Sequence, residues 1–148
     1  MANSIHGIPV HGRGQGTQIS ARLDTPAASG SRSACLTVDM TIDPGLYVYG
    51  QPVPEGFIPL SIDIPPRAGL VVGTPVFPSP KPYQMEGLDD VLFIYEGGLS
   101  VAIPLTFAAA GDDITLAVQV RYQTCSDRGC FMPQTVELHL PVRAKCLA

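Results

Sequence analysis

Hydrophobic and polar residues alternate along two long segments in the last third of the chain. In residues 114–122 every second side chain is hydrophobic, while the side chains between them are mostly polar, and residues 135–142 repeat the pattern. Successive side chains of an extended strand point to opposite faces, so each segment predicts a half-buried β-strand. The two strands flank a short segment with two cysteines, which predicts a hairpin with the cysteine pair at or near its tip.

Seven further segments predict shorter strands, by alternation or by their content of β-branched and aromatic residues. They are residues 19–23, 36–42, 47–49, 61–64, 70–77, 91–95 and 99–107. Glycine and proline turn signals separate many of them, and Glu96-Gly97-Gly98 predicts a tight hairpin between two of them. About eight or nine short strands with frequent turns are typical of an antiparallel β-sandwich, so the predicted fold class is all-β.

Proline changes this pattern in two places. Pro104 lies within residues 99–107 and has no N–H to donate, so it predicts an edge strand or a bulge. Residues 77–83 carry proline at three alternate positions, which predicts an extended, polyproline-like crossing and excludes a central strand. With residues 84–90 this crossing forms one long connection, and long connections on a sandwich are often functional.

Composition narrows the class of protein. The chain has 148 residues, enough for one domain with its own core. Its 15 glycines and 15 prolines interrupt every long segment, which argues against a helical bundle. No apolar run reaches the ~18 residues of a membrane span. The net charge of −4 argues against nucleic acid and anionic membranes as partners.

The two ends of the chain differ from its middle. Residues 1–16 are rich in glycine, lack hydrophobic periodicity and contain no apolar segment of a signal peptide. We therefore expect a flexible lead-in or linker at 1–16, one sandwich domain at 17–142 and a C-terminal tail at 143–148.

The strongest chemical signal is the pair Cys125 and Cys130, with four residues between the two cysteines. A hairpin tip can bring two such residues within disulfide distance. One interpretation is a structural disulfide, which the loop-entropy relation values at about 2 kcal/mol. The other is a redox pair that a partner protein reaches; Arg121 and Arg128 would favour a thiolate there and Asp127 would oppose it.

A metal site is a weaker interpretation of the pair. Zinc motifs place their cysteines closer together and need a second pair of ligands, which this sequence does not offer. We expect neither a metal nor an organic cofactor. Of the other cysteines, Cys35 lies on the polar side of its strand and is expected to be a free thiol, and Cys146 lies in the tail. A bridge between Cys35 and Cys146 remains an open alternative.

The residues around the pair resemble a known family. The run YQTCSDRGCFMPQTVEL, which begins at Tyr122, is similar to the signature of the N-terminal domain of DsbD, the bacterial transmembrane thiol–disulfide reductant. Residues 44–49 and 94–97 resemble two further strand and turn motifs of that family. The resemblance covers about residues 17–142. The chain departs from it at Phe131, where others have Leu or Tyr, and at Met132, where many members have Pro.

The resemblance implies an immunoglobulin-like β-sandwich that carries a redox-active disulfide. It implies a thiol–disulfide oxidoreductase domain outside the cytoplasm, in the bacterial periplasm or at the exterior of the cell envelope. Such a domain takes electrons from a thioredoxin-like donor and passes them to oxidised protein targets. Residues 51–56 resemble copies attached to peroxiredoxin-like proteins, so a peroxiredoxin-like partner is also expected. No membrane contact is expected from this segment itself.

The resemblance also assigns roles to residues. Cys130 is the sulfur that partners attack, and Cys125 then resolves the mixed disulfide. A physical argument agrees, because an apolar, exposed-looking stretch follows Cys130, whereas Cys125 lies nearer the core end of its strand. The residues expected to shape the site are Tyr47, Tyr49, Tyr83, Met85, Leu88, Tyr122 and Phe131.

These shaping residues have different expected places. Tyr47 or Tyr49 is expected beside the disulfide, although both also fit an ordinary strand. Tyr83, Met85 and Leu88 belong to the long connection, which we expect to lie near the cysteine hairpin and to gate access to it. Tyr122 fits the core. The competing interpretation of the whole protein is a non-enzymatic, immunoglobulin-like binding module whose disulfide is structural.

Overall fold

The described part of the chain contains fourteen strands, which form three sheets. Every pairing between these strands is antiparallel. The computed structural model describes residues 2–7, 10–24, 33–84, 87, 89, 91–107 and 114–147, with the backbone alone at 2–7 and 143–147. Within these residues there is no helix of the length and hydrophobicity that a membrane crossing requires. The all-β fold class is confirmed.

The three sheets have simple strand orders. The first sheet is β1 (Ala2–Gly7), β14 (Gln134–Leu147), β11 (Ile114–Tyr122) and β6 (Ser61–Asp63). The second is β2 (Val10–Gly14), β3 (Thr17–Asp24), β4 (Ser33–Ile42), β10 (Gly98–Phe107) and β7 (Leu70–Val72). The third is β13 (Gly129–Cys130), β12 (Thr124–Ser126), β5 (Tyr47–Tyr49), β9 (Val91–Tyr95) and β8 (Lys81–Gln84).

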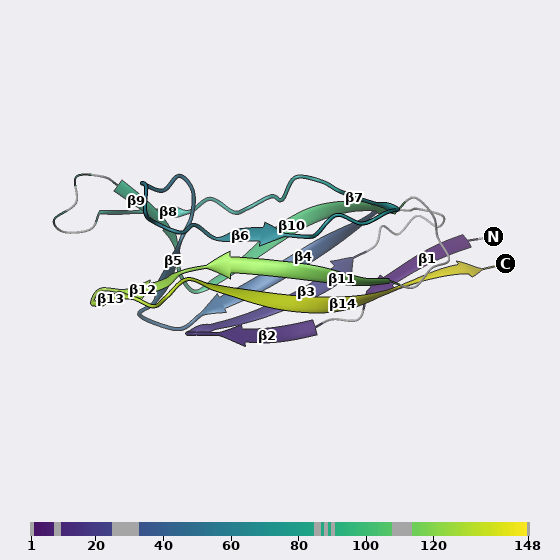
Figure 1. Ribbon diagram of the computed structural model, residues 1–148, viewed down its shortest axis with the longest axis horizontal. Helices are drawn as coiled ribbons and strands as arrows, with labels where there is room; N and C mark the ends of the chain where they lie inside the picture. The colour runs from purple at the N-terminus through teal and green to yellow at the C-terminus, as the bar shows by residue number, and fades with distance from the viewer. Residues whose placement is uncertain are drawn as a thin grey trace.

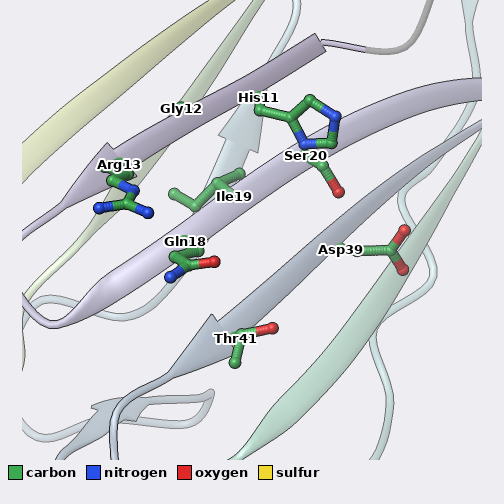
Figure 2. A pocket seen from close by; sticks show the side chains of 8 residues that line it. All are labelled: His11, Gly12, Arg13, Gln18, Ile19, Ser20, Asp39 and Thr41. Atoms are coloured by element: carbon green, nitrogen blue, oxygen red, sulfur yellow. The ribbon is translucent and has the colours of Figure 1, made fainter.

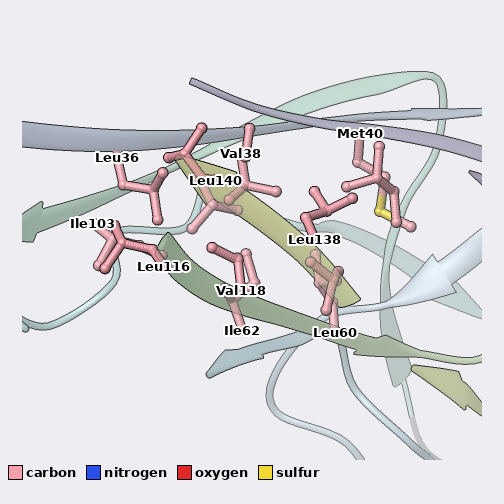
Figure 3. Close-up of a cluster of buried hydrophobic side chains, with 14 of the residues drawn as sticks. Leu36, Val38, Met40, Leu60, Ile62, Ile103, Leu116, Val118, Leu138 and Leu140 are labelled. Atoms are coloured by element: carbon pink, nitrogen blue, oxygen red, sulfur yellow. The ribbon is translucent and has the colours of Figure 1, made fainter. Parts of the chain in front are cut away.

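The main hydrophobic core lies between the first and second sheets. Leu36 and Val38 of β4 face Leu138 and Leu140 of β14, and Val118 of β11 lies beside them (Figure 3). These five side chains alternate with polar ones along their strands, as the period of two predicts. Each buried side chain of this size stabilises the fold by roughly 1.5–3 kcal/mol relative to an exposed one.

The third sheet extends the sandwich at one end. Both chain termini lie at the opposite end from β12 and β13 (Figure 1). The chain passes from the first sheet into the third at Gln123, between β11 and β12. The predicted hairpin of residues 114–142 is therefore present, and its tip, which carries the cysteines, belongs to a different sheet from its stem.

The expected loose lead-in at residues 1–16 is wrong for most of that segment, because β1 pairs with the end of β14 and β2 pairs with β3. The same pairing makes residues 143–147 a strand, not a tail. The glycines of β2 allow it to approach the first sheet closely. A Cβ atom on Gly12 would lie 2.6 Å from Cδ2 of Leu138, and one on Gly14 would lie 1.8 Å from the hydroxyl of Tyr122.

The tight hairpin predicted at Glu96-Gly97-Gly98 is also wrong. β9 and β10 lie in different sheets, so the chain changes sheets there instead of folding back on itself. Gly97 has a φ of 72°, in the left-handed region that favours glycine, and its carbonyl accepts a hydrogen bond from the N–H of Ile42. The sequence thus predicted the turn correctly. Whether the two strands that flank a turn form a hairpin depends on whether they pair with each other, and β9 and β10 pair with other strands.

More strands are present than the eight or nine predicted, because β1, β2, β8, β12 and β13 were not anticipated. The edge strand that Pro104 predicted is wrong, because β10 lies between β4 and β7 and Pro104 pairs with Cys35 of β4. On the other side the pairing with β7 ends at Val72, the N–H of Gly73 donates to the carbonyl of Pro104 at 2.7 Å, and an isolated bridge joins Val76 to Ala102. β8 contains Pro82 and lies at the edge of its sheet, in agreement with the exclusion of a central strand.

Candidate functional site

The cysteine hairpin is a two-stranded ribbon with a short turn. Asp127 and Arg128 form the turn, and the hydroxyl of Ser126 accepts a hydrogen bond from the N–H of Arg128 at 3.2 Å. Gly129 follows with a φ of 146°, a backbone conformation that other residues rarely adopt. The serine and the glycine therefore set the turn that brings the two cysteines opposite each other.

Cys125 and Cys130 form a disulfide and are direct cross-strand partners, with their Cα atoms 4.0 Å apart. On the side away from the turn, the next pair is Thr124 and Phe131. It is hydrogen-bonded, since the N–H of Phe131 donates to the carbonyl of Thr124 at 2.8 Å. Pairs alternate along an antiparallel ladder, so the cysteines occupy a non-hydrogen-bonded pair, where side chains come closest.

The two sulfur-bearing residues differ in burial. Cys125 has 0% of its surface exposed and belongs to the small hydrophobic cluster of the third sheet. Cys130 is exposed. The expectation that Cys125 is the more shielded residue is confirmed. The difference arises because β12 has β5 on its other side, whereas β13 is the edge strand of the sheet.

Two tyrosines of β5 line the buried side of the disulfide. Tyr47 and Tyr49 share one face of the strand, and their rings meet edge to face with centroids 5.9 Å apart. The hydroxyl of Tyr49 lies 3.7 Å from Sγ of Cys130. A disulfide sulfur carries no hydrogen, so the hydroxyl is the donor. The hydroxyl of Tyr47 donates to the carbonyl of Ser126 at 3.5 Å.

Both tyrosines resist ionisation. Burial, followed by the neighbouring Tyr49 and Tyr83, raises the pKa of Tyr47 from 10.0 to about 12. Burial also raises the pKa of Tyr49. A tyrosine in a poorly solvated position stays protonated, because its charged form loses hydration there. The two hydroxyls therefore remain hydrogen-bond donors at neutral pH.

The long connection of residues 77–90 reaches the disulfide turn through Tyr83. The ring of Tyr83 lies 5.3 Å from that of Tyr47, between centroids, and its hydroxyl donates to Oδ1 of Asp127 at 3.4 Å. Met85 and Leu88, which were expected in the same capping segment, lie outside the described residues. The part of the connection that is described thus lies beside the turn between the cysteines.

The sequence of residues 20–141 matches the family described as thiol:disulfide interchange protein DsbD, N-terminal. The chain belongs to this family. The match covers the sandwich and the cysteine motif, and the predicted immunoglobulin-like β-sandwich is confirmed as the family's fold. No curated protein sequence matches the chain.

Solved structures similar to this DsbD N-terminal domain share its fold. The N-terminal periplasmic domain of ScsB from Proteus mirabilis is 19% identical, with a TM-score of 0.60 over 86% of this chain. The chain spans about half of that structure, 47%. The DsbD N-terminal domain of Neisseria meningitidis, in its complex with the PilB N-terminal domain, is 17% identical, with a TM-score of 0.52 over 82% of this chain and 80% of that one.

A third similar structure has another name. The GAE domain of GGA2p from Saccharomyces cerevisiae is 9% identical, with a TM-score of 0.54, over 89% of this chain and 96% of that one. At such identities a likeness shows the fold alone, and one sandwich fold serves many functions. Arguments about function must therefore come from the cysteine motif and its surroundings.

Two residues predicted to shape the site, Tyr122 and Phe131, are not members of the small cluster. Tyr122 is fully buried in the main core, where its hydroxyl shares a short hydrogen bond with that of Thr17. Phe131 is 44% exposed, and the next residue, Met132, is 81% exposed. Tyr122 thus belongs to the stem of the hairpin, while Phe131 and Met132 form an apolar surface directly after Cys130.

Sequence reasoning missed several residues of this DsbD N-terminal site. Leu92 and Ile94 of β9 and Phe57 complete the cluster around Cys125, and the ring of Phe57 meets that of Tyr49 at 5.0 Å between centroids. Alternation in β9 signals that Leu92 and Ile94 share a face, but not which sheet they join. Nothing in the sequence near Phe57 predicts its contact with Tyr49.

Charges near the disulfide are sparse. Among the described residues no ion pair joins Arg121 or Arg128 to Asp127, whose carboxylate accepts from Tyr83 instead. Nowhere among the residues that the structure describes do three or more His, Cys, Asp or Glu side chains lie close enough together to hold a metal ion. Cys35 is free, so the alternative bridge to Cys146 is absent.

A separate hollow opens on the outer face of the second sheet (Figure 2). Side chains of β2, β3 and β4 line it: His11, Arg13, Gln18, Ile19, Ser20, Asp39 and Thr41, with Gly12. Asp39 is already held by Arg22 and Ser100. None of the lining residues comes from the third sheet, so the hollow is not part of the disulfide site.

Proposed function

We propose that this domain performs thiol–disulfide exchange, and that Cys125 and Cys130 cycle between a disulfide and two thiols. Electrons pass from a thioredoxin-like donor to oxidised protein targets. The observation that carries the proposal is the asymmetry of the pair: Cys130 is exposed at a sheet edge, whereas Cys125 is fully buried. Thiol–disulfide exchange needs one sulfur that a partner's thiolate can attack. The second sulfur is the leaving group of that step and later re-forms the disulfide.

In the proposed cycle the donor's thiolate attacks Sγ of Cys130. The bond between the two sulfurs breaks, and Cys125 leaves as a thiolate that takes up a proton. The donor's second thiol then attacks the mixed disulfide, so the donor becomes a disulfide and the domain holds two thiols. Two electrons and two protons have moved onto the pair.

The second half of the cycle reduces a target. The thiolate of Cys130 attacks a disulfide of the oxidised protein and forms a mixed disulfide with it. Cys125 then attacks Sγ of Cys130, which releases the target as a dithiol and restores the starting bond. Tyr49 is a positioning residue in this scheme, because its hydroxyl lies 3.7 Å from Sγ of Cys130, the sulfur that is the attacking thiolate in this half of the cycle.

The long connection that contains Tyr83 is proposed to gate access to the sulfurs. The contact between Tyr83 and Asp127 ties this connection to the turn between the cysteines. Release of that contact would let β8 move away from the disulfide. Lids that act in this way control access to many active sites.

Location and partners are proposed from the family and its solved structures. The ScsB domain is periplasmic, and the DsbD N-terminal domain of Neisseria meningitidis forms a complex with a PilB domain. We infer an extracytoplasmic site of action for this chain, where disulfides form and persist. Thioredoxin-like or peroxiredoxin-like proteins are its expected exchange partners, with oxidised proteins as its targets.

The competing function is a binding module with a structural disulfide. The complete burial of Cys125 favours it, because a buried sulfur is a poor participant in exchange by itself. In that case the disulfide would only fasten the hairpin, and the loops at this end would bind a partner without redox chemistry.

A redox titration separates the two functions. The protein with Cys35→Ser and Cys146→Ser is equilibrated with glutathione or dithiothreitol buffers, and its free thiols are counted, so that only the pair contributes. A reversible potential above about −300 mV supports exchange, whereas a lower one is typical of a structural disulfide and would contradict the proposal.

A further inference from the structure

Met132 stands out among the large hydrophobic residues of the described surface, with 81% of its surface exposed. It comes two residues after Cys130 and directly before Pro133. The disulfide chemistry proposed above does not use it. Met40, by contrast, is 2% exposed in the main core. Of the two methionines in the described part of the chain, one is thus open to solvent beside the cysteine pair and the other is protected from it.

The backbone holds Met132 in this place. The N–H of Phe131 donates to Thr124, and the carbonyl of Phe131 accepts from Nε2 of Gln123 at 3.2 Å. Pro133 follows, and a residue before proline is restricted to extended conformations. Met132 therefore projects from an anchored segment directly after the exposed Cys130, and its exposure does not come from a loose loop.

We infer that Met132 is an oxidation site that regulates docking at the disulfide. Peroxide-class oxidants convert its thioether to a sulfoxide: the O–O bond of hydrogen peroxide breaks, an S–O bond forms, and water leaves. The sulfur loses two electrons and the peroxide gains them. The product is polar and chiral where the side chain was apolar. The effect on docking rests on the proposed exchange function, but the modification itself does not.

The consequence follows from where partners must approach. A protein that attacks Cys130 covers the adjoining Phe131 and Met132, whose exposed apolar surface favours contact. Burying a sulfoxide without a hydrogen-bond partner is unfavourable. Oxidation at Met132 therefore slows exchange with protein partners. A small reductant needs no such surface, so its reaction with the disulfide stays unchanged.

The test uses the protein with Cys35→Ser and Cys146→Ser in its disulfide form, so that no thiol competes for the oxidant. The protein is treated with hydrogen peroxide, and peptide mapping measures sulfoxide at each methionine. We expect Met132 to be oxidised well before Met40. Equal oxidation of the two, or none at Met132 when Met40 reacts, would overturn the assignment of the site.

The second part measures how fast a bacterial thioredoxin, or dithiothreitol, reduces the disulfide before and after peroxide. By the usual cost of losing a contact at an interface, we expect a roughly three- to tenfold slower reaction with thioredoxin and no change with dithiothreitol. Met132→Leu keeps an apolar side chain but has no thioether at this position. Thioredoxin should therefore reduce this variant equally fast before and after peroxide treatment. An equal loss in Met132→Leu, or no loss in the parent protein, would overturn the regulatory role.

The two proposals fail in different ways. If thioredoxin does not reduce the untreated protein, the proposed exchange function fails and the docking effect fails with it. Peptide mapping still decides in that case whether Met132 is the modification site. If the untreated protein is reduced and its Met132 sulfoxide form reacts as fast, the exchange function stands and only the regulatory inference is wrong.

Discussion

The hydroxyl of Tyr49 lies 3.7 Å from Sγ of Cys130, the exposed cysteine of the pair. Tyr49 is almost fully buried, and burial raises the pKa of its hydroxyl, so the group stays a donor. After reduction, the same hydroxyl would face the thiolate of Cys130. A hydrogen bond to a charged acceptor is stronger than one to a neutral acceptor.

Loss of this donor should weaken the nucleophile. In a Cys125→Ser background, Tyr49→Phe should slow alkylation of Cys130 by iodoacetamide at neutral pH by roughly tenfold, since a hydrogen bond to a charged group is worth about 1.5 kcal/mol. The control is Tyr47→Phe, because the hydroxyl of Tyr47 binds the carbonyl of Ser126 instead of a sulfur. Equal rates in both variants would exclude a specific role for Tyr49.

The contact between Tyr83 and Asp127 predicts how reductants reach the disulfide. Tyr83→Ala removes both the hydrogen bond to the turn and the ring that packs on Tyr47, so dithiothreitol should reduce the disulfide severalfold faster. Lys81→Ala on the same strand loses only an exposed ion pair with Glu96 and should leave the rate unchanged. A parent-like rate for Tyr83→Ala would show that the connection does not gate the sulfurs.

Tyr122 should matter for stability and not for redox chemistry. Its hydroxyl is buried with that of Thr17, so Tyr122→Phe leaves the Thr17 hydroxyl without its partner. The free energy of unfolding should fall by about 1–3 kcal/mol in urea titrations. The redox potential of the cysteine pair should match that of the parent, whereas a shifted potential would place Tyr122 in the site after all.

Alkaline pH should destabilise the domain in a defined window. The pKa of Tyr47 is 10.0 when the chain is unfolded and about 12 in the folded protein. The folded state therefore binds the proton more tightly, so this contribution to stability is complete below pH 10 and is lost as the pH rises to about 12. Tyr47→Phe should flatten the decline, measured as the urea midpoint against pH. A decline of the same slope in the variant would assign it to other groups.

The sequence pattern predicted three of the strands with their bounds. The residues expected at 47–49 and 91–95 form β5 and β9 with those bounds, and 114–122 forms β11. Each of these segments buries one or both faces, so its hydrophobic pattern is strong. β2 was missed because two of its three inward positions are Gly12 and Gly14, which fit close approach and carry no hydrophobic signal.

The candidate site was only partly visible in the sequence. The cysteine motif identified the pair and its family, and the position of Cys125 near the core end of its strand predicted it as the more shielded member. The contacts of Tyr49 with Cys130 and of Tyr83 with Asp127 join residues 81 and 44 positions apart. Such contacts depend on which strands become neighbours in the third sheet, and alternation within a single strand carries no information about that.

Trapping a mixed disulfide tests the central claim most directly. Cys125→Ser and Cys130→Ser proteins, both without Cys35 and Cys146, are treated with Ellman's reagent to place a thionitrobenzoate on the remaining cysteine. Each is then mixed with a thioredoxin that keeps only its attacking cysteine. The account predicts rapid release of thionitrobenzoate and a stable complex through Cys130 in the Cys125→Ser protein, and little complex in the Cys130→Ser protein, whose remaining sulfur lies on a buried residue. A complex that forms only with Cys130→Ser, or with neither variant, would contradict it.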